Sequence, residues 1–154
     1  MTQKKIRNPK TTQKQLDPLL KNIEKILGIL SIEEIVYITN KESKDYLFEN
    51  TFCGKGILSK SQPRLPYEPL QLSPFEAFYL ISELKKLQVV YEETNEIVPS
   101  QTLWDLFSQQ NQNFSAKYGA YRYFRKKGWV PKSGLKFASD FVIYQKGPSY
   151  FHAK

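Results

Sequence analysis

Cysteine and histidine are almost absent from this chain of 154 residues, which holds one of each, Cys53 and His152. A single cysteine cannot form a disulfide bond within the chain, and one cysteine with one histidine cannot supply the ligands of a Cys/His zinc site. We therefore expect no metal ion and no other cofactor. Cys53 is interpreted as a small buried apolar side chain.

Long apolar runs are also absent. No segment approaches the roughly 18 apolar residues needed to cross a bilayer, and the first residues lack the apolar core of a signal peptide. We therefore expect an intracellular, soluble protein with no membrane partner. The content of 40% hydrophobic and 14% aromatic residues is enough for one ordinary core or two small ones.

Acidic residues are scarce at the end of the chain. Residues 118–154 contain eight basic residues and one acid, Asp140, whereas residues 1–117 are nearly balanced in charge. The same segment holds ten of the 22 aromatic residues. Because cations neutralise phosphates and aromatic rings stack on bases, this composition favours RNA or a single-stranded nucleic acid as partner.

The beginning of the chain predicts a flexible basic arm over residues 1–16. It carries five basic residues and no acid, which is typical of a solvated tail, with nuclear targeting or RNA tethering as the alternative. Asp17 and Pro18 then suit the start of a helix, because Asp caps free amides and Pro at the first helical position loses no hydrogen bond. Apolar residues at helical spacing predict that this helix continues to Leu30.

The next part of the chain predicts extended structure. Residues 32–39 are rich in β-branched side chains and predict a strand, followed by a turn at residues 40–43. Residues 52–61 include Gly-Lys-Gly without the spacing of a phosphate-binding loop, so we expect no nucleotide there. Three prolines make residues 61–70 extended.

The strongest local helix signal is the capping box that begins at Ser73, with Pro at the first helical position. A short strand is predicted at residues 89–92, and Ser100 is expected to cap a short helix. The polar, unperiodic residues 108–113 then mark the boundary between two units. The predicted units are therefore 17–108 and 109–154.

The second unit is predicted to begin with a helix. Aromatic residues from Phe114 share one helical face, and Gly128 is well placed to end that helix in a left-handed conformation. Short strands are predicted at residues 129–132, 135–137 and 140–144. Helices and strands are mixed in both halves, so the predicted fold class is α+β with two small domains.

Tyr144 and His152, eight residues apart, are the candidate catalytic residues. Histidine has a pKa of about 6.5 and can give or take a proton at physiological pH. RNA carries its own nucleophile, the 2′-OH, and in-line attack needs a base, an acid and a cation. Tyrosine, histidine and lysine can fill these roles without a metal ion. Spacing alone still favours an ordinary structural position for His152.

Two stretches of this sequence resemble the tRNA-splicing, or tRNA-intron, endonuclease family. The first is YRYFRKKGWVPKSGLKF at residues 121–137, followed by DFVIY at 140–144, KGP at 146–148 and His152. The second comprises GKGILSKSQP, PYEPLQLS and EAF between residues 54 and 78. Together they are most similar to the eukaryotic catalytic subunit that cuts the 5′ splice site.

This resemblance implies an N-terminal α/β domain and a C-terminal catalytic domain of nuclease type. It implies an RNA endonuclease of the lyase type that removes introns from pre-tRNA and leaves a 2′,3′-cyclic phosphate and a 5′-OH. Tyr144 corresponds to the base at the 2′-OH and His152 to the acid at the 5′-oxygen. The family also implies a nuclear hetero-oligomer, a heterotetramer, with other endonuclease subunits as partners.

Two departures from the family pattern stand out. The family's third catalytic residue is a lysine a few tens of residues beyond the histidine, whereas this sequence ends at Lys154. We therefore expect a catalytic domain that is incomplete at its C-terminus, and a chain that is inactive and aggregation-prone by itself. Ala138 and Ser139 stand where the family often has a glycine, a departure that we expect to cost little, although a left-handed backbone there would tolerate alanine poorly.

The lysines near Tyr144 and His152 are assigned to RNA binding: Lys132, Lys136 and Lys146. The leading hypothesis is a catalytic endonuclease subunit. The alternative is a subunit of the same complex that binds RNA or supports assembly and has lost catalysis. A third hypothesis is an unrelated basic RNA-binding module, which would bind RNA without preference for tRNA shape.

Overall fold

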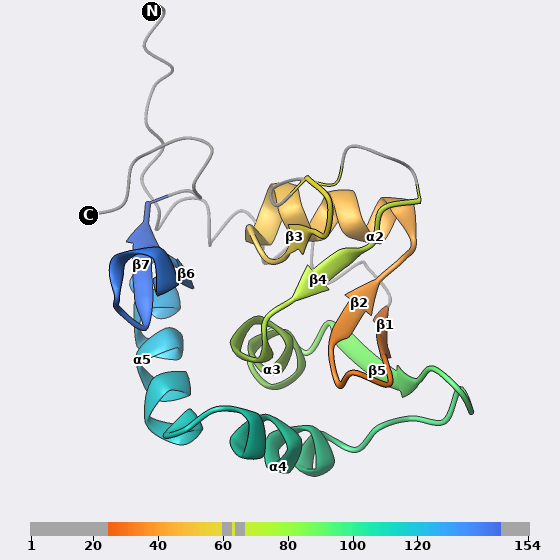
Figure 1. The fold of residues 1–154 in the computed structure, drawn as a ribbon. Helices are drawn as coiled ribbons and strands as arrows, with labels where there is room; N and C mark the ends of the chain where they lie inside the picture. The colour runs from red at the N-terminus through yellow and green to blue at the C-terminus, as the bar shows by residue number, and fades with distance from the viewer. Residues whose placement is uncertain (1–24, 60–62, 64–66, 146–154) are drawn as a thin grey trace, which may run out of the picture. The chain divides into compact units, whose positions relative to one another are not determined.

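The structure is a computed structural model that describes residues 25–59, 63 and 67–145. The predicted arm, the predicted helix start at Asp17, Lys146 and His152 lie outside the described residues. The chain divides into two compact units, whose described parts are residues 25–118 and 119–145 (Figure 1). We call them the first and the second unit. The division falls between Tyr118 and Gly119, whereas the sequence predicts a boundary after residue 108.

A five-stranded sheet in the order β3-β4-β2-β1-β5 forms the centre of the first unit. The parallel neighbours are β1 (Ile26–Leu30) and β5 (Leu87–Tyr91), and the other pairs are antiparallel. The remaining strands are β2 (Val36–Ile38), β3 (Lys55–Gly56) and β4 (Leu70–Leu72). Helices and strands in both units confirm the α+β class.

Strand β1 corrects the prediction of a helix that reaches Leu30. Ile26, Gly28 and Leu30 are buried at every second position, which is the period of a strand. The apolar run is short and fits either period, and pairing with β5 decides between them. The strand predicted at residues 32–39 is confirmed only at Val36–Ile38, because residues 32–34 form the turn that joins β1 to β2.

The turn predicted at residues 40–43 is also wrong, since a helix begins there. The side-chain oxygen of Asn40 accepts a hydrogen bond from the Ser43 amide at 3.0 Å and caps α2 (Lys41–Tyr46). One π-helical segment, η1 (Leu47–Thr51), continues it. Asparagine favours turns and helix caps for the same reason, a short side chain that bonds nearby amides, so the sequence could not separate the two.

The capping box at Ser73 is confirmed as the start of α3 (Pro74–Ser82). The Ser73 hydroxyl accepts from the Glu76 amide at 3.2 Å, and one carboxylate oxygen of Glu76 accepts from the Ser73 amide at 3.0 Å. The other carboxylate oxygen accepts from the Gly54 amide at 2.6 Å. Glu76, which is buried, therefore ties the loop before β3 to the start of α3.

A second buried carboxylate holds the turn after β3. One oxygen of Glu68 accepts from the amides of Leu58 and Ser59 at 2.8 and 2.7 Å, and the other accepts from the Ser59 hydroxyl. The Glu68 carbonyl accepts from the buried Lys44 ammonium at 2.7 Å. The amides around Gly-Lys-Gly thus already donate to the protein's own carboxylates and are not available to bind a phosphate.

An aromatic cluster joins α3, α4 (Ser100–Gln110) and the first turn of α5 (Phe114–Lys126). Its ring centroids lie 4.8 to 6.0 Å apart. Its members are Phe75, Phe78, Trp104, Phe114 and Tyr118. The hydroxyls of Ser82 and Tyr118 also lie 2.8 Å apart. These contacts explain why the first five residues after the predicted boundary loop belong to the first unit.

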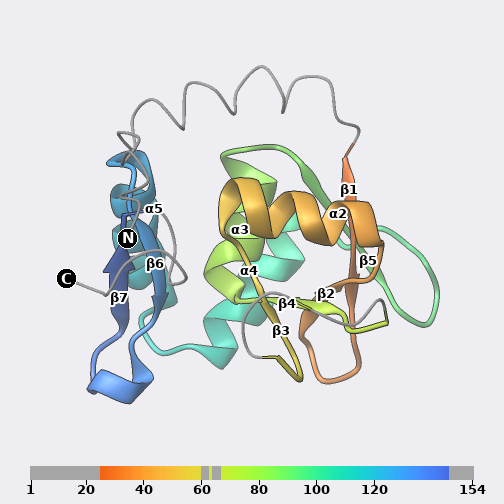
Figure 2. The ribbon, with the colours of Figure 1, turned by 90° about the horizontal axis from the view of Figure 1, so that it is seen from above.

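The predicted strand at residues 89–92 is confirmed as part of β5, and the predicted short helix is confirmed as α4. Ser100 is the first residue of that helix and not its cap, a position that Pro99 takes without a side-chain bond. Figure 2 shows α3 and α4 on the same side of the sheet. In the part of the chain that the structure describes, no helix combines the length and apolarity of a membrane span.

Tyr46 gives a test of packing in the first unit. Its hydroxyl is buried and has no hydrogen-bond partner within the described residues, and burial raises the pKa of Tyr46 above its ordinary value of 10.0. A raised pKa means that the unfolded chain loses this proton first. Its contribution to stability is therefore present below about pH 10 and is lost as the pH rises further.

We expect Tyr46→Phe to leave the free energy of unfolding unchanged at neutral pH or raise it by about 1 kcal/mol, because no hydrogen bond is lost. Above about pH 10 the variant should lose less stability than the parent chain. Urea denaturation at both pH values measures this. Tyr67→Phe, at a side chain that is 77% exposed, is the control. Destabilisation of Tyr46→Phe by more than about 1 kcal/mol at neutral pH would show that the hydroxyl has a partner.

Candidate active site

Helix α5 supplies the support of the second unit. Beyond Tyr118 it buries Tyr121 and Arg125. Gly128 ends it with φ of 88°, and the Trp129 amide donates to the Phe124 carbonyl at 3.0 Å. This is the left-handed helix end that the sequence predicted at Gly128, and it turns the chain directly into the next strand.

A two-stranded antiparallel hairpin carries the predicted site residues that the structure describes, Tyr144, Lys132 and Lys136. Strand β6 (Val130–Ser133) pairs with β7 (Phe141–Tyr144), with Val130 opposite Tyr144 and Ser133 opposite Phe141. These strands confirm the strands predicted at residues 129–132 and 140–144, and every boundary agrees to within one residue. Successive side chains on a strand alternate between faces, so the register assigns each residue to one face of the hairpin.

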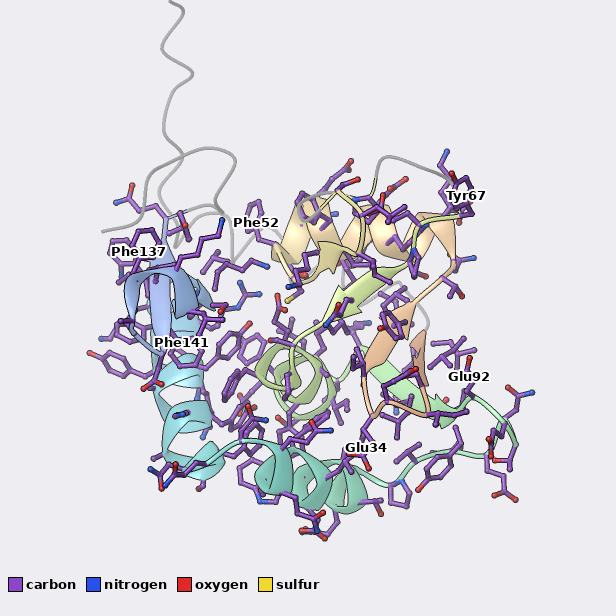
Figure 3. The ribbon with its side chains drawn as sticks, in the orientation of Figure 1. Glu34, Phe52, Tyr67, Glu92, Phe137 and Phe141 are labelled. Atoms are coloured by element: carbon purple, nitrogen blue, oxygen red, sulfur yellow. The ribbon has the colours of Figure 1, made fainter. Side chains whose placement is uncertain are left out.

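One face of the hairpin packs on α5. The rings of Tyr121 and Phe141 have centroids 6.0 Å apart, which places the face of Phe141 and Ile143 against the helix (Figure 3). Tyr144 lies one residue further along and therefore belongs to the opposite face. Its neighbours there are Val142 on its own strand and Val130 directly across from it.

Lys132 shares this face with Tyr144. It lies two residues beyond Val130, which makes it a diagonal cross-strand neighbour of Tyr144, and both side chains are half-buried. Diagonal neighbours are about 7–8 Å apart, within reach of long side chains. The register thus makes Tyr144 and Lys132, which are twelve residues apart in the sequence, diagonal neighbours on one face.

Lys136 lies at the other end of the hairpin. It is exposed in η2 (Leu135–Phe137), a 3₁₀ turn, so the strand predicted at residues 135–137 is wrong. Val130 and Ser133 are three residue steps apart along β6, so the Val130–Tyr144 pair lies about 10 Å from the Ser133–Phe141 pair at the rise of a strand. The structure therefore does not bring Lys136 beside Tyr144.

The turn is closed around Gly134. Its carbonyl accepts from the amides of Phe137 and Ser139 at 2.9 and 3.1 Å, and its amide donates to the Asp140 carbonyl at 3.2 Å. A Cβ on Gly134 would meet the Ser139 carbonyl oxygen at 2.6 Å, so a side chain does not fit. These bonds favour a tight turn over continued strand pairing, and sequence reasoning missed them.

Among the described residues no group of three or more His, Cys, Asp and Glu side chains has the arrangement of a metal site.

The sequence analysis gave no role to Leu135 and Phe137, which are strongly exposed at the turn. Gly134 in the segment Ser-Gly-Leu-Lys-Phe was the available signal, because glycine inside a strand pattern often marks a turn or a bulge.

Comparison with known families covers both units. The model of the tRNA intron endonuclease N-terminal domain matches residues 30–104, and the model of the catalytic C-terminal domain matches residues 114–154. This chain belongs to the tRNA intron endonuclease family. The resemblance noted from the motifs is confirmed, and the hairpin with Tyr144 and Lys132 lies within the segment that matches the catalytic domain.

Relatives in this family come from animals and archaea. The chain is 43% identical over 105 residues to the tRNA-splicing endonuclease subunit Sen2 of Gallus gallus and 42% identical over 99 residues to that of Mus musculus. It is 33% identical over 120 residues to a tRNA-splicing endonuclease of Saccharolobus islandicus. These matches cover 68%, 64% and 77% of this chain, and 22%, 21% and 65% of the respective relatives.

Ala138 is a strained position in this family member. It follows η2 with φ of 52° and ψ of 36°, the left-handed region. The left-handed conformation costs an L-residue with a Cβ roughly 1–2 kcal/mol, whereas glycine adopts this conformation freely. The backbone at Ala138 is therefore left-handed, which is the case in which the sequence predicted that alanine would be tolerated poorly.

We expect Ala138→Gly to raise the free energy of unfolding by about 0.5–1 kcal/mol, because glycine also increases the entropy of the unfolded chain and offsets part of the gain. The same substitution at Ala116, exposed in α5, should lower it by about 1 kcal/mol. Urea denaturation of both variants measures the contrast. Destabilisation by Ala138→Gly as large as that of Ala116→Gly would contradict the strain.

Proposed function

We propose that this chain is the catalytic subunit of a tRNA-splicing endonuclease and cleaves pre-tRNA at the 5′ splice site. The observation that carries the proposal is the shared hairpin face of Tyr144 and Lys132 within the segment that matches the catalytic domain. The relatives named above, a tRNA-splicing endonuclease and the tRNA-splicing endonuclease subunit Sen2, support the same activity.

The reaction follows from the chemistry of RNA. The phenolate oxygen of Tyr144 takes the proton of the 2′-OH, and the 2′-oxygen attacks the adjacent phosphorus in line with the 5′-oxygen. The bond from phosphorus to the 5′-oxygen breaks, and His152 gives its proton to that oxygen. The products are a 2′,3′-cyclic phosphate and a 5′-OH. The Lys132 ammonium binds the phosphate, whose charge grows in the transition state.

Charge separates the two units in a way that suits RNA. Residues 119–145 contain six basic residues and one acid. In the first unit, the turns after β1 and β5 lie side by side, since the Glu92 amide donates to the Leu30 carbonyl at 3.1 Å. These turns expose five glutamates and no basic residue: Glu33, Glu34, Glu92, Glu93 and Glu96.

The acidic turns affect a nearby tyrosine. Burial, and then the charges of Glu33 and Glu92, raise the pKa of Tyr37 above its ordinary value of 10.0. Figure 3 labels Glu34 and Glu92 from the two turns.

The negative charge of these exposed glutamates repels phosphates, so the RNA binds the second unit. Lys132 and Lys136, together with Lys146, are the proposed phosphate contacts.

The working enzyme is a nuclear hetero-oligomer, a heterotetramer, in which other endonuclease subunits recognise the shape of the tRNA. The word subunit in the relatives' names supports an assembly. In that assembly this chain cuts the 5′ splice site, and its partners supply the remaining contacts to the pre-tRNA.

The test uses the complex isolated through a tag on this chain and an intron-containing pre-tRNA transcript. We expect Tyr144→Phe and His152→Ala each to lower the single-turnover rate of 5′-site cleavage by about 10²–10⁴-fold, the range for loss of a general base or acid. Cleavage by the parent complex should persist in EDTA and leave a cyclic phosphate. Tyr123→Phe, at a tyrosine that is 57% exposed on α5, is the matched control.

Cleavage at the parent rate in both Tyr144→Phe and His152→Ala would contradict a catalytic role. The chain would then bind RNA or support assembly in a complex whose active site lies elsewhere. Loss of activity in Tyr123→Phe as well would point to general damage of the hairpin and α5.

A further inference from the structure

The turn between β6 and β7 carries the two most exposed large apolar side chains of the described second unit. Leu135 is 85% exposed and Phe137 is 66% exposed, on either side of the exposed Lys136. Figure 3 labels Phe137 at this turn. Phe141, only four residues after Phe137, instead packs its ring near Tyr121. The turn therefore presents one aromatic ring, one aliphatic side chain and one ammonium group to the surroundings.

The turn is ordered by its own backbone. The Phe137 and Ser139 amides donate to the Gly134 carbonyl, and the Ala138 amide donates to the Leu135 carbonyl at 3.3 Å. Ala138 holds the left-handed conformation directly after the ring. The backbone that carries the ring is therefore ordered before a partner arrives, which lowers the entropy lost on binding.

The charge of the second unit indicates which class of molecule binds at the Phe137 ring. Six basic residues against one acid favour a polyanion, and Lys136 lies between the two apolar side chains. The centres of protein interfaces are depleted in lysine, because an ammonium group loses its hydration there. An aromatic ring beside a cation is instead the combination that binds unpaired bases and their phosphates.

We propose that Phe137 stacks on an unpaired base of the RNA substrate while Lys136 contacts a neighbouring phosphate. The proposal rests on the proposed function and adds a contact that specifies where the RNA lies. Tyr144 is at the opposite end of the hairpin, at least about 10 Å away along β6. A stacked strand rises about 3.4 Å per nucleotide, so this distance corresponds to about three stacked nucleotides and to fewer in an extended strand.

The experiment measures binding of the tagged complex to a pre-tRNA with a 2′-deoxy nucleotide at the 5′ cut, which removes the nucleophile and prevents cleavage. We expect Phe137→Leu to weaken binding roughly tenfold, whereas Phe137→Tyr keeps the affinity of the parent because the π-face remains. Lys136→Ala should weaken binding and reduce the salt dependence by about one phosphate contact. Phe137→Leu should leave the salt dependence unchanged.

Leu135→Ala is the matched control, since it removes an even more exposed apolar side chain of the same turn that has no π-face. We expect it to bind RNA as the parent does. Equal affinity of Phe137→Leu and the parent would overturn the proposal. So would release of the other subunits by Leu135→Ala or Phe137→Leu, which would identify the turn as a protein-docking surface.

The parent complex on unmodified pre-tRNA separates the two proposals. Cleavage at the 5′ site, together with unchanged binding by Phe137→Leu, would retain the proposed function and reject the stacking contact. Absence of cleavage by the parent complex would reject the proposed function itself, whatever Phe137→Leu does to binding.

Discussion

The register of the β6–β7 hairpin is the constraint on which the candidate active site depends. A shift of one residue would turn Tyr144 towards α5 and remove Phe141 from it, because side chains alternate between the two faces. The ring contact between Tyr121 and Phe141 and the closed turn at Gly134 both oppose that shift. Neither is part of the proposed chemistry, yet together they decide what Tyr144 faces.

The first unit uses buried charge to hold its loops. Glu76 and Glu68 bind backbone amides of the segment around β3, and each is almost completely buried. Carboxylates in this setting persist because each oxygen has a donor. Five exposed glutamates lie instead in the two turns at one end of the sheet, whereas residues 119–145 contain six basic residues and one acid. Loop fixation thereby uses carboxylates of the first unit, and the proposed RNA binding uses the cations of the second unit.

The sequence predicted best where a local signal specified the structure. The capping box at Ser73 and the glycine at position 128 are examples, because each acts within a few residues. The sequence-based predictions failed where residues distant in the sequence, or two equally suited local structures, were involved. Ile26–Leu30 is a strand because β5 pairs with it, and Asn40 caps a helix where a turn was equally suited.

The same distinction holds for the site. The motifs predicted the family and named Tyr144, but the shared face with Lys132 depends on a cross-strand register that no local pattern contains. The exposure of Phe137 follows from backbone hydrogen bonds to Gly134, which the sequence indicated only through a glycine in a strand pattern. The roles of Tyr144 and His152 come from the family resemblance and stay proposals.

The most direct test replaces the bridging 5′-oxygen at the cut with sulfur and measures single-turnover cleavage by the tagged complex. A thiolate with a pKa of about 8.5 leaves without a proton, so the acid becomes unnecessary while the base does not. The account predicts that the sulfur substrate restores His152→Ala to nearly the parent rate and leaves Tyr144→Phe slow. Rescue of Tyr144→Phe, or no rescue of His152→Ala, would contradict the assignment of base and acid.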